Sequence, residues 1–198
     1  MAAQHEALVR IDLLRRMTKQ VIGGAWRDEG WAGAHKVLGA MLGVSEDPAL
    51  ARRYNRLGLL PDGSFGRALW EHWTSRDFSM PGQRNGFPER MIFHDLGHVL
   101  SGYDTDFDGE LQQAAFQAGF VRNDGFVFLF FAIAQFHLGI KITPVAPAAV
   151  GHLDIEKVMT ALGRGAACKV DLSDHWDFWP HMPRPLEEVR AELGIPSA

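Results

Sequence analysis

Cysteine is almost absent from this sequence, because Cys168 is the single cysteine among 198 residues. One thiol cannot form an internal disulfide, and without a CxxC partner it does not indicate a thiolate metal site. The sequence therefore gives no sign of an oxidising compartment. We expect Cys168 to be a small residue of the core.

Clustered positive charge is also missing. The chain has 20 lysines and arginines against 24 aspartates and glutamates, with a formal net charge of -4. No basic run is longer than the pairs Arg15-Arg16 and Arg52-Arg53. Proteins that bind a phosphate backbone carry a basic patch, so we expect no nucleic-acid partner.

Apolar runs long enough to cross a membrane are lacking as well. The stretch "GFVFLFFAIAQFHLGI", from Gly125 to Ile140, includes nine consecutive apolar residues, whereas a spanning helix needs about 20. We expect it to be a buried helix or one that contacts lipid. The N-terminal segment contains Glu6 and Asp12 and no uninterrupted apolar region, unlike a secretory signal. We therefore expect a cytoplasmic protein.

Strand-like alternation is scarce, and apolar residues recur at helical spacing instead, as in Phe65, Leu69 and Trp73. The length and the content of 46% hydrophobic and 22% charged residues are typical of one globular domain. The sequence predicts an all-α, single-domain helical bundle over residues 1–198, with Pro- and Gly-rich connecting loops.

Helix ends can be placed in two segments. Asp154 is suited to the start of a helix that Gly163 would end. Near the C-terminus, Pro185 is suited to the first helical position and Gly194 to the residue after the last one.

Two histidines give the chain its chemical signal. The segment "PERMIFHDLGHVLSG" is predicted to be helical, and His94 and His98 in it are offset by only ~40° around the axis. Both imidazoles therefore leave one face, as they do when a helix grips a metal. Asp95, ~60° from His98, can join the ligands or orient a histidine. Two helical histidines without any ligand are the plainer alternative.

A glutamate follows these histidines after a turn. If Gly102 ends the first helix and Gly109 opens the next, the chain doubles back and Glu110 faces the imidazoles. Two histidines with one or two carboxylates form a nitrogen and oxygen donor set. Such a set suits zinc, iron or manganese rather than calcium.

The intervening stretch "YDTDFDGEL" resembles the start of a calcium-binding EF-hand loop. Asp104, Asp106 and Asp108 alternate before Gly109, but the twelfth loop position, which needs a bidentate glutamate, is Ala115. We therefore interpret the aspartates as a solvated turn, with Asp108 near a helix start.

The pattern H-D-x-x-H, eleven residues and E, made by His94, Asp95, His98 and Glu110, matches the zinc-ligand motif of the ubiquinone (coenzyme Q) biosynthesis protein 4 family. The resemblance extends to "LPDGSFGRALWEHW", "GYDTDFDGELQQAAFQAG" and "WPHMPRPLEEVRAELGI". It covers roughly residues 60–195, and the first 50 residues match only as a generic amphipathic helix.

The resemblance implies an all-α fold, one divalent metal, and a groove for a polyprenyl chain. Zinc comes first as the metal, with iron or manganese as alternatives. It further implies a polyprenylated quinone precursor as ligand, other ubiquinone-biosynthesis proteins as partners, and peripheral association with the inner (cytoplasmic) membrane. A homodimer stays open. The family is described both as an enzyme that oxidatively decarboxylates the ring at C1 and as a scaffold of the biosynthetic complex.

The four motif residues fit either class. As an enzyme, His94, His98 and Glu110 would hold a metal with open positions while Asp95 moves a proton, which makes all four candidate catalytic residues. Ligation by all four would give a closed, structural site. A rival class is the HD-type phosphohydrolase, for which His72 and Asp124 would be further ligands.

An apolar run such as Gly125 to Ile140 is by default a helix of the protein core. The resemblance favours a second role for it, as one wall of a channel that binds the prenyl chain. The candidate lipid-binding residues are Phe126, Phe130, Ile133 and His137, of which His137 is also suited to a hydrogen-bonded core position. Tryptophans in loops or core are ordinary, but Trp70, Trp73, Trp176 and Trp179 are candidates for a rim at a membrane interface.

Overall fold

A computed structural model describes residues 2–122, 124–142, 146–173 and 176–196 of the chain. Helices joined by loops make up these ranges, which contain no β-strand and only isolated bridges such as Leu138 with Val150. The all-α prediction is confirmed. The elements are α1 (Ala2–Met41), α2 (Pro48–Asn55), η1 (Arg56–Leu59), α3 (Phe65–Thr74), η2 (Glu89–Met91), α4 (Phe93–Ser101), α5 (Phe107–Phe120), α6 (Phe126–Phe136), α7 (Ile155–Ala166), η3 (Trp179–His181) and α8 (Leu186–Leu193).

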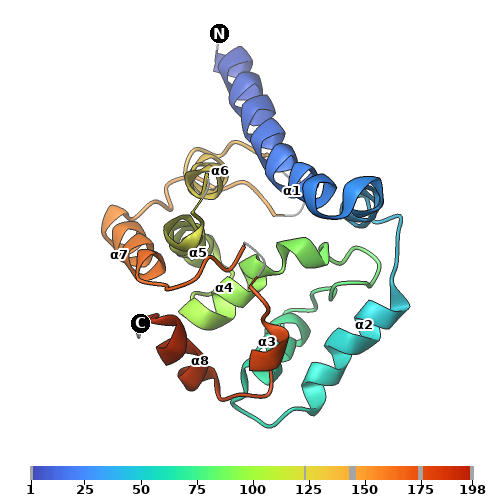
Figure 1. The fold of residues 1–198 in the computed structure, drawn as a ribbon. Helices are drawn as coiled ribbons and strands as arrows, with labels where there is room; N and C mark the ends of the chain where they lie inside the picture. The colour runs from blue at the N-terminus through green and yellow to red at the C-terminus, as the bar shows by residue number, and fades with distance from the viewer. Residues whose placement is uncertain (1, 123, 143–145, 174–175, 197–198) are drawn as a thin grey trace.

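The main core lies around α3, α4 and α5. The predicted stripe of α3 is confirmed, because Phe65, Leu69 and Trp73 are at most 1% exposed. Figure 1 shows α5, α6 and α7 gathered on one side of the molecule, with α4 between them and α3 and α8. Cys168 is buried, as the sequence predicts.

Glycine allows α5 and α7 to pack at backbone distance. A Cβ atom added at Gly165 would lie 1.9 Å from the carbonyl oxygen of Phe116. The sequence predicts that Gly163 ends this helix, but α7 continues to Ala166. The N-terminal prediction is confirmed, since the Asp154 carboxylate accepts a hydrogen bond from the Lys157 amide.

The C-terminal helix agrees with prediction to within one residue. Gly194 ends α8 in the left-handed conformation, with φ of 73°. Pro185 is the residue before the helix rather than its first residue, and its ψ of 133° is extended.

Helix α1 covers one side of the bundle without joining the main core. Gly30, with φ of 66° and ψ of -152°, bends it. The part before Gly30 extends away from the body towards the N-terminus in Figure 1. Small separate clusters attach α1, one of them centred on Val21, Ala25 and Val37. An ion pair of 2.6 Å between Arg90 and Asp28 adds a polar contact.

None of the helices within the described ranges combines the length and apolar character that crossing a bilayer requires.

Candidate metal centre

Helix α4 presents the two histidines as their spacing predicts. The 3-10 turn of η2 leads into α4, and Gly102, with φ of 79°, ends it in the left-handed conformation. The Nε2 atoms of His94 and His98 are 3.3 Å apart. Both imidazoles therefore converge on one point beside the helix.

The chain then reverses and starts α5 opposite α4. Asp106 caps α5 by accepting a hydrogen bond of 2.7 Å from the Gly109 amide. Gly109 thus lies in the first turn of the helix, which begins two residues earlier, at Phe107. It is needed for close packing, because a Cβ there would lie 2.2 Å from the Asp104 carbonyl oxygen. This arrangement directs Glu110 back towards α4.

Glu110 completes a group of three potential metal ligands. Its Oε2 lies 3.5 Å from His94 Nε2, and its Oε1 lies 3.4 Å from His98 Nε2. One potential ligand atom from each residue lies within 4.8 Å of the others. His98 is only 3% exposed. The predicted meeting of His94, His98 and Glu110 is therefore confirmed.

The other ring nitrogens of the histidines decide what this group can bind. His98 Nδ1 lies 3.0 Å from the Tyr103 carbonyl oxygen, which can only accept, so Nδ1 donates. His94 Nδ1 lies 3.1 Å from Gln117 Oε1 and donates in the same way. In neutral rings both Nε2 atoms then carry lone pairs that face each other and a carboxylate. Such a point needs a cation, and the residues fit a divalent metal.

Two arginines hold the end of α4. Arg190 donates from Nε to the Leu100 carbonyl (2.9 Å) and from Nη2 to the Val99 carbonyl (2.8 Å). Arg164 donates from Nη2 to the Ser101 carbonyl at 3.0 Å. These carbonyls have no partner within the helix, so both guanidinium groups satisfy them and complement the helix dipole.

In the protein alone, a proton can provide the positive charge. Burial lowers the pKa of the His94 imidazole, but the hydrogen bond and charge of Glu110 outweigh it and raise this pKa to about 9. Burial raises the pKa of the Glu110 carboxyl, but His94 and His98 outweigh that effect and hold the pKa well below its usual range. A metal must therefore displace a proton from His94.

Asp95 occupies a different place from the other motif residues. Its Oδ2 accepts a hydrogen bond of 2.8 Å from Trp73 Nε1. Burial raises the pKa of the Asp95 carboxyl, against the opposing charge of His94. It is not in the three-residue group that the described chain brings together. Direct ligation by Asp95 stays a prediction, while a supporting position beside His94 agrees with this geometry.

His72 comes from α3 and lies against the centre. Its ring stacks on that of His98, with centroids 5.3 Å apart and planes 26° apart. Burial, followed by the charge of His98, lowers the pKa of His72 to about 3. Asp124, its partner in the HD-type alternative, is exposed in the loop before α6. Among the described residues, neither His72 nor Asp124 belongs to a group of potential metal ligands.

The three aspartates of the loop have protein partners. Asp104 pairs with Arg76 at 2.7 Å, Asp106 caps α5, and Asp108 Oδ1 lies 2.7 Å from His152 Nδ1. Their oxygens serve these contacts in the structure. The sequence-based argument against an EF-hand agrees with this arrangement.

The four candidate lipid-binding residues differ in their exposure to solvent. Phe126 and Phe130 are 51% and 57% exposed, and their ring centroids lie 6.2 Å apart. Ile133 packs against the main core, and His137 Nδ1 accepts a hydrogen bond from the Leu153 amide. Lipid binding stays a prediction, for which the exposed phenylalanine pair is the available surface.

The predicted tryptophan rim is placed mostly against protein. Trp73 is buried, and Trp70, Trp176 and Trp179 are partly buried against the main core. The strongly exposed tryptophans are Trp26 and Trp31 of α1, at 53% and 70%. Neither of these two belongs to the predicted rim.

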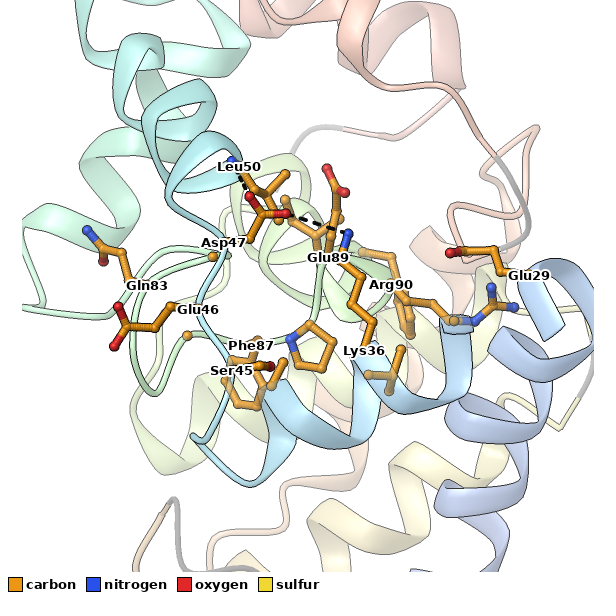
Figure 2. Close-up of a pocket in the computed structure, with 18 of the residues that line it drawn as sticks. Glu29, Lys36, Ser45, Glu46, Asp47, Leu50, Gln83, Phe87, Glu89 and Arg90 are labelled. Atoms are coloured by element: carbon orange, nitrogen blue, oxygen red, sulfur yellow. Dashed lines mark hydrogen bonds and ion pairs between the residues drawn. The ribbon is translucent and has the colours of Figure 1, made fainter. Parts of the chain in front are cut away.

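A cavity of about 540 Å³ lies on another side of the N-terminal end of α4. Its walls come from α1 after the bend, the start of α2 and the loops before α4 and η3. Figure 2 shows the Asp47 carboxylate at its edge, paired with Lys36 and bonded to the Leu50 amide. Ile92 and Phe93 line it, but the three potential ligands do not. The cavity is therefore adjacent to the candidate metal centre and separate from it.

Sequence reasoning missed several residues that shape the centre. Gln117 and the Tyr103 carbonyl fix the imidazoles, and Trp73 binds Asp95. Gln117 lies on α5 two turns after Glu110, on the same helix face, so helical spacing could have suggested it. The contacts of Trp73 and His72 join distant segments and have no comparable local signal.

Comparison with known proteins adds information about the fold. No protein-family model matches the sequence, and no curated protein matches it. Among solved structures, the chain is similar to a candidate ubiquinone biosynthesis protein from Nostoc punctiforme, with a TM-score of 0.50 and 17% identity over 97% of each chain. At this identity the likeness shows a shared all-α fold.

Proposed function

We propose that this chain is a metal-dependent protein of ubiquinone biosynthesis. It binds a polyprenylated benzoate-type precursor and oxidatively decarboxylates the ring at C1. The observation that carries the proposal is the convergence of His94 Nε2, His98 Nε2 and the Glu110 carboxylate. The motif resemblance to the ubiquinone (coenzyme Q) biosynthesis protein 4 family and the fold shared with the Nostoc protein support the pathway.

His94, His98 and Glu110 would hold the metal, with zinc first and iron or manganese as alternatives, because their donors are nitrogen and oxygen. When bound, the metal would polarise a carboxylate or phenolate oxygen of the ring. Three protein ligands leave coordination positions for such an oxygen. Tyr103 and Gln117 keep the two imidazoles turned towards this position.

Asp95 is the residue that we propose to move a proton. Burial raises the pKa of its carboxyl above the ordinary value, which makes the carboxylate a stronger proton acceptor. Trp73 holds one carboxylate oxygen by a hydrogen bond, so that the group stays in one orientation. His94 follows directly before it in the chain and is coupled to it electrostatically.

The prenyl chain and the membrane belong to the same proposal. The exposed rings of Phe126 and Phe130 offer apolar contact area to a prenyl chain or to a membrane surface. A peripheral position on the cytoplasmic membrane and contact with other ubiquinone-biosynthesis proteins would follow from such a ligand.

A scaffold that binds the prenylated precursor without changing it is the second candidate. The same exposed phenylalanine pair favours it, since lipid binding alone needs no reaction. The HD-type phosphohydrolase is not favoured, because His72 and Asp124 do not join the group of potential ligands.

Carboxyl-labelled precursor with a short prenyl chain separates the two candidates. Release of the carboxylate as CO₂ and its replacement by a hydroxyl group is a two-electron oxidation. Dioxygen in the assay accepts the two electrons and leaves as hydrogen peroxide, and water balances the oxygen and hydrogen atoms. We expect the protein loaded with at least one of zinc, iron and manganese to release labelled CO₂, and folded Asp95→Asn and His98→Gln to release none with any of them. His152→Gln, which changes a histidine outside the centre, should keep the activity. Bound but unchanged precursor with all three metals would support the scaffold instead.

A further inference from the structure

His72 is a buried polar residue beside the proposed metal centre that the motif does not include. It is 8% exposed, its ring stacks on that of His98, and it meets the Phe78 ring at 70° with the centroids 6.2 Å apart. An apolar ring could fill this position with the same contacts. The presence of an imidazole there needs a reason beyond packing.

The Nε2 atom of His72 is buried and has no hydrogen-bond partner among the described residues. A buried polar atom without a partner destabilises a protein, and such atoms are rare in native structures. Where one persists beside a functional centre, the partner is often a bound group. The His72 ring itself stacks on the ring of His98, one of the two converging histidines.

A metal held by His94, His98 and Glu110 would leave this nitrogen unpaired. His72 is not a member of the group whose ligand atoms lie within 4.8 Å of one another. A hydrogen-bond acceptor on a ligand bound at the centre is a suitable partner for this nitrogen. For an aromatic acid bound at a metal, the atoms available are carboxylate and phenolate oxygens.

We propose that His72 is a substrate-binding residue, whose Nε2 donates a hydrogen bond to an oxygen of the aromatic acid bound at the metal centre. This inference rests on the proposed function and assigns a contact outside the four-residue motif. Without the aromatic acid, the unpaired Nε2 atom lowers the stability of the protein. The bound acid supplies the missing hydrogen-bond acceptor.

His72→Phe tests the inference, because phenylalanine keeps the stacking on His98 and removes the nitrogen. Co²⁺ serves as a visible probe of the metal site, and 4-hydroxybenzoate serves as the aromatic acid. We expect Co²⁺ affinity within about twofold of wild type, since no ligand is lost. The Kd of 4-hydroxybenzoate for the Co²⁺-loaded protein should rise about tenfold, the value of one hydrogen bond. The urea midpoint of the metal-free variant should rise.

His152→Phe is the matched control, because it changes a half-exposed histidine outside the centre and should leave both affinities unchanged. His72→Leu replaces His72→Phe if the larger ring prevents folding. An unchanged Kd for 4-hydroxybenzoate would overturn the role of His72 alone. Loss of Co²⁺ binding in a folded His72 variant would also overturn it, since His72 would then be a ligand. Failure of the wild type to bind Co²⁺ would overturn the proposed function as well.

Discussion

Metal binding should release a proton from His94, and its affinity should therefore depend on pH. Burial lowers the pKa of this imidazole, but Glu110 outweighs it and raises the pKa to about 9. Below this pKa the metal has to displace the proton, whereas above it the nitrogen is already free. The apparent affinity should rise with pH up to about 9 and level off beyond it.

The size of the effect follows from the same pKa. Competition with one proton changes affinity by up to about tenfold for each pH unit, and with a pKa of about 9 the gain between pH 7 and pH 9 is roughly fiftyfold. The His94 side chain is 34% exposed, and solvent screening at that edge weakens the influence of Glu110. We therefore expect a gain of between about tenfold and about fiftyfold over this range.

Titration with zinc against a competing chelator at several pH values measures this dependence, and calorimetry in buffers of different ionisation enthalpy counts the released proton. In the metal-free protein, an NMR titration reports the pKa of His94 directly. Glu110→Gln should lower that pKa well below about 9, because burial then acts against only the smaller effects of Asp95 and Gln117. Glu192→Gln, which changes an ion-paired glutamate elsewhere, should not. Zinc affinity that is constant from pH 7 to pH 9, without proton release, would refute the reasoning.

Two further predictions concern the framework of the centre. Gly165→Ala should destabilise the protein by about 2–3 kcal/mol, because the added methyl group would clash with the Phe116 backbone. Gly163→Ala lies in the same helix but faces open space, so it should stabilise the protein by up to about 1 kcal/mol. Urea unfolding of both variants measures these changes, and equal effects would contradict the close packing of α5 and α7. Arg164→Met should leave the buried Ser101 carbonyl without a hydrogen-bond partner, which should lower the free energy of unfolding by about 2 kcal/mol. Because Ser101 belongs to α4, which carries both histidines, the variant should also bind zinc more weakly. Unchanged urea unfolding and zinc titrations would contradict this role.

Local patterns explain which parts of the fold could be predicted. The stripe of α3, the left-handed ends at Gly102 and Gly194, and the histidine pair depend on residues within a few positions of one another. The meeting of Glu110 with the histidines needed one further step, a reversal of the chain between two helices. That reversal was marked by a glycine and a capping aspartate.

Long-range packing explains what the sequence did not predict. Gly163 has the residue type of a helix end, but α7 continues because it packs along α5. Gly30 bends α1 in the interior of a helix that runs from Ala2 to Met41. Trp73 reaches Asp95 and His72 reaches His98 only because α3 packs on α4, and no local spacing encodes these contacts. The cavity beside α1 likewise forms from segments that are distant in sequence.

Zinc titration of the wild type, His98→Gln and His152→Gln tests the central claim most directly. The account predicts about one zinc ion for each wild-type chain, with an affinity that falls at least about a hundredfold in His98→Gln and is unchanged in His152→Gln. His98 and His152 are both histidines with acidic neighbours, but only His98 belongs to the converging group. Equal zinc affinity in all three proteins, or no zinc binding by the wild type, would contradict the claim.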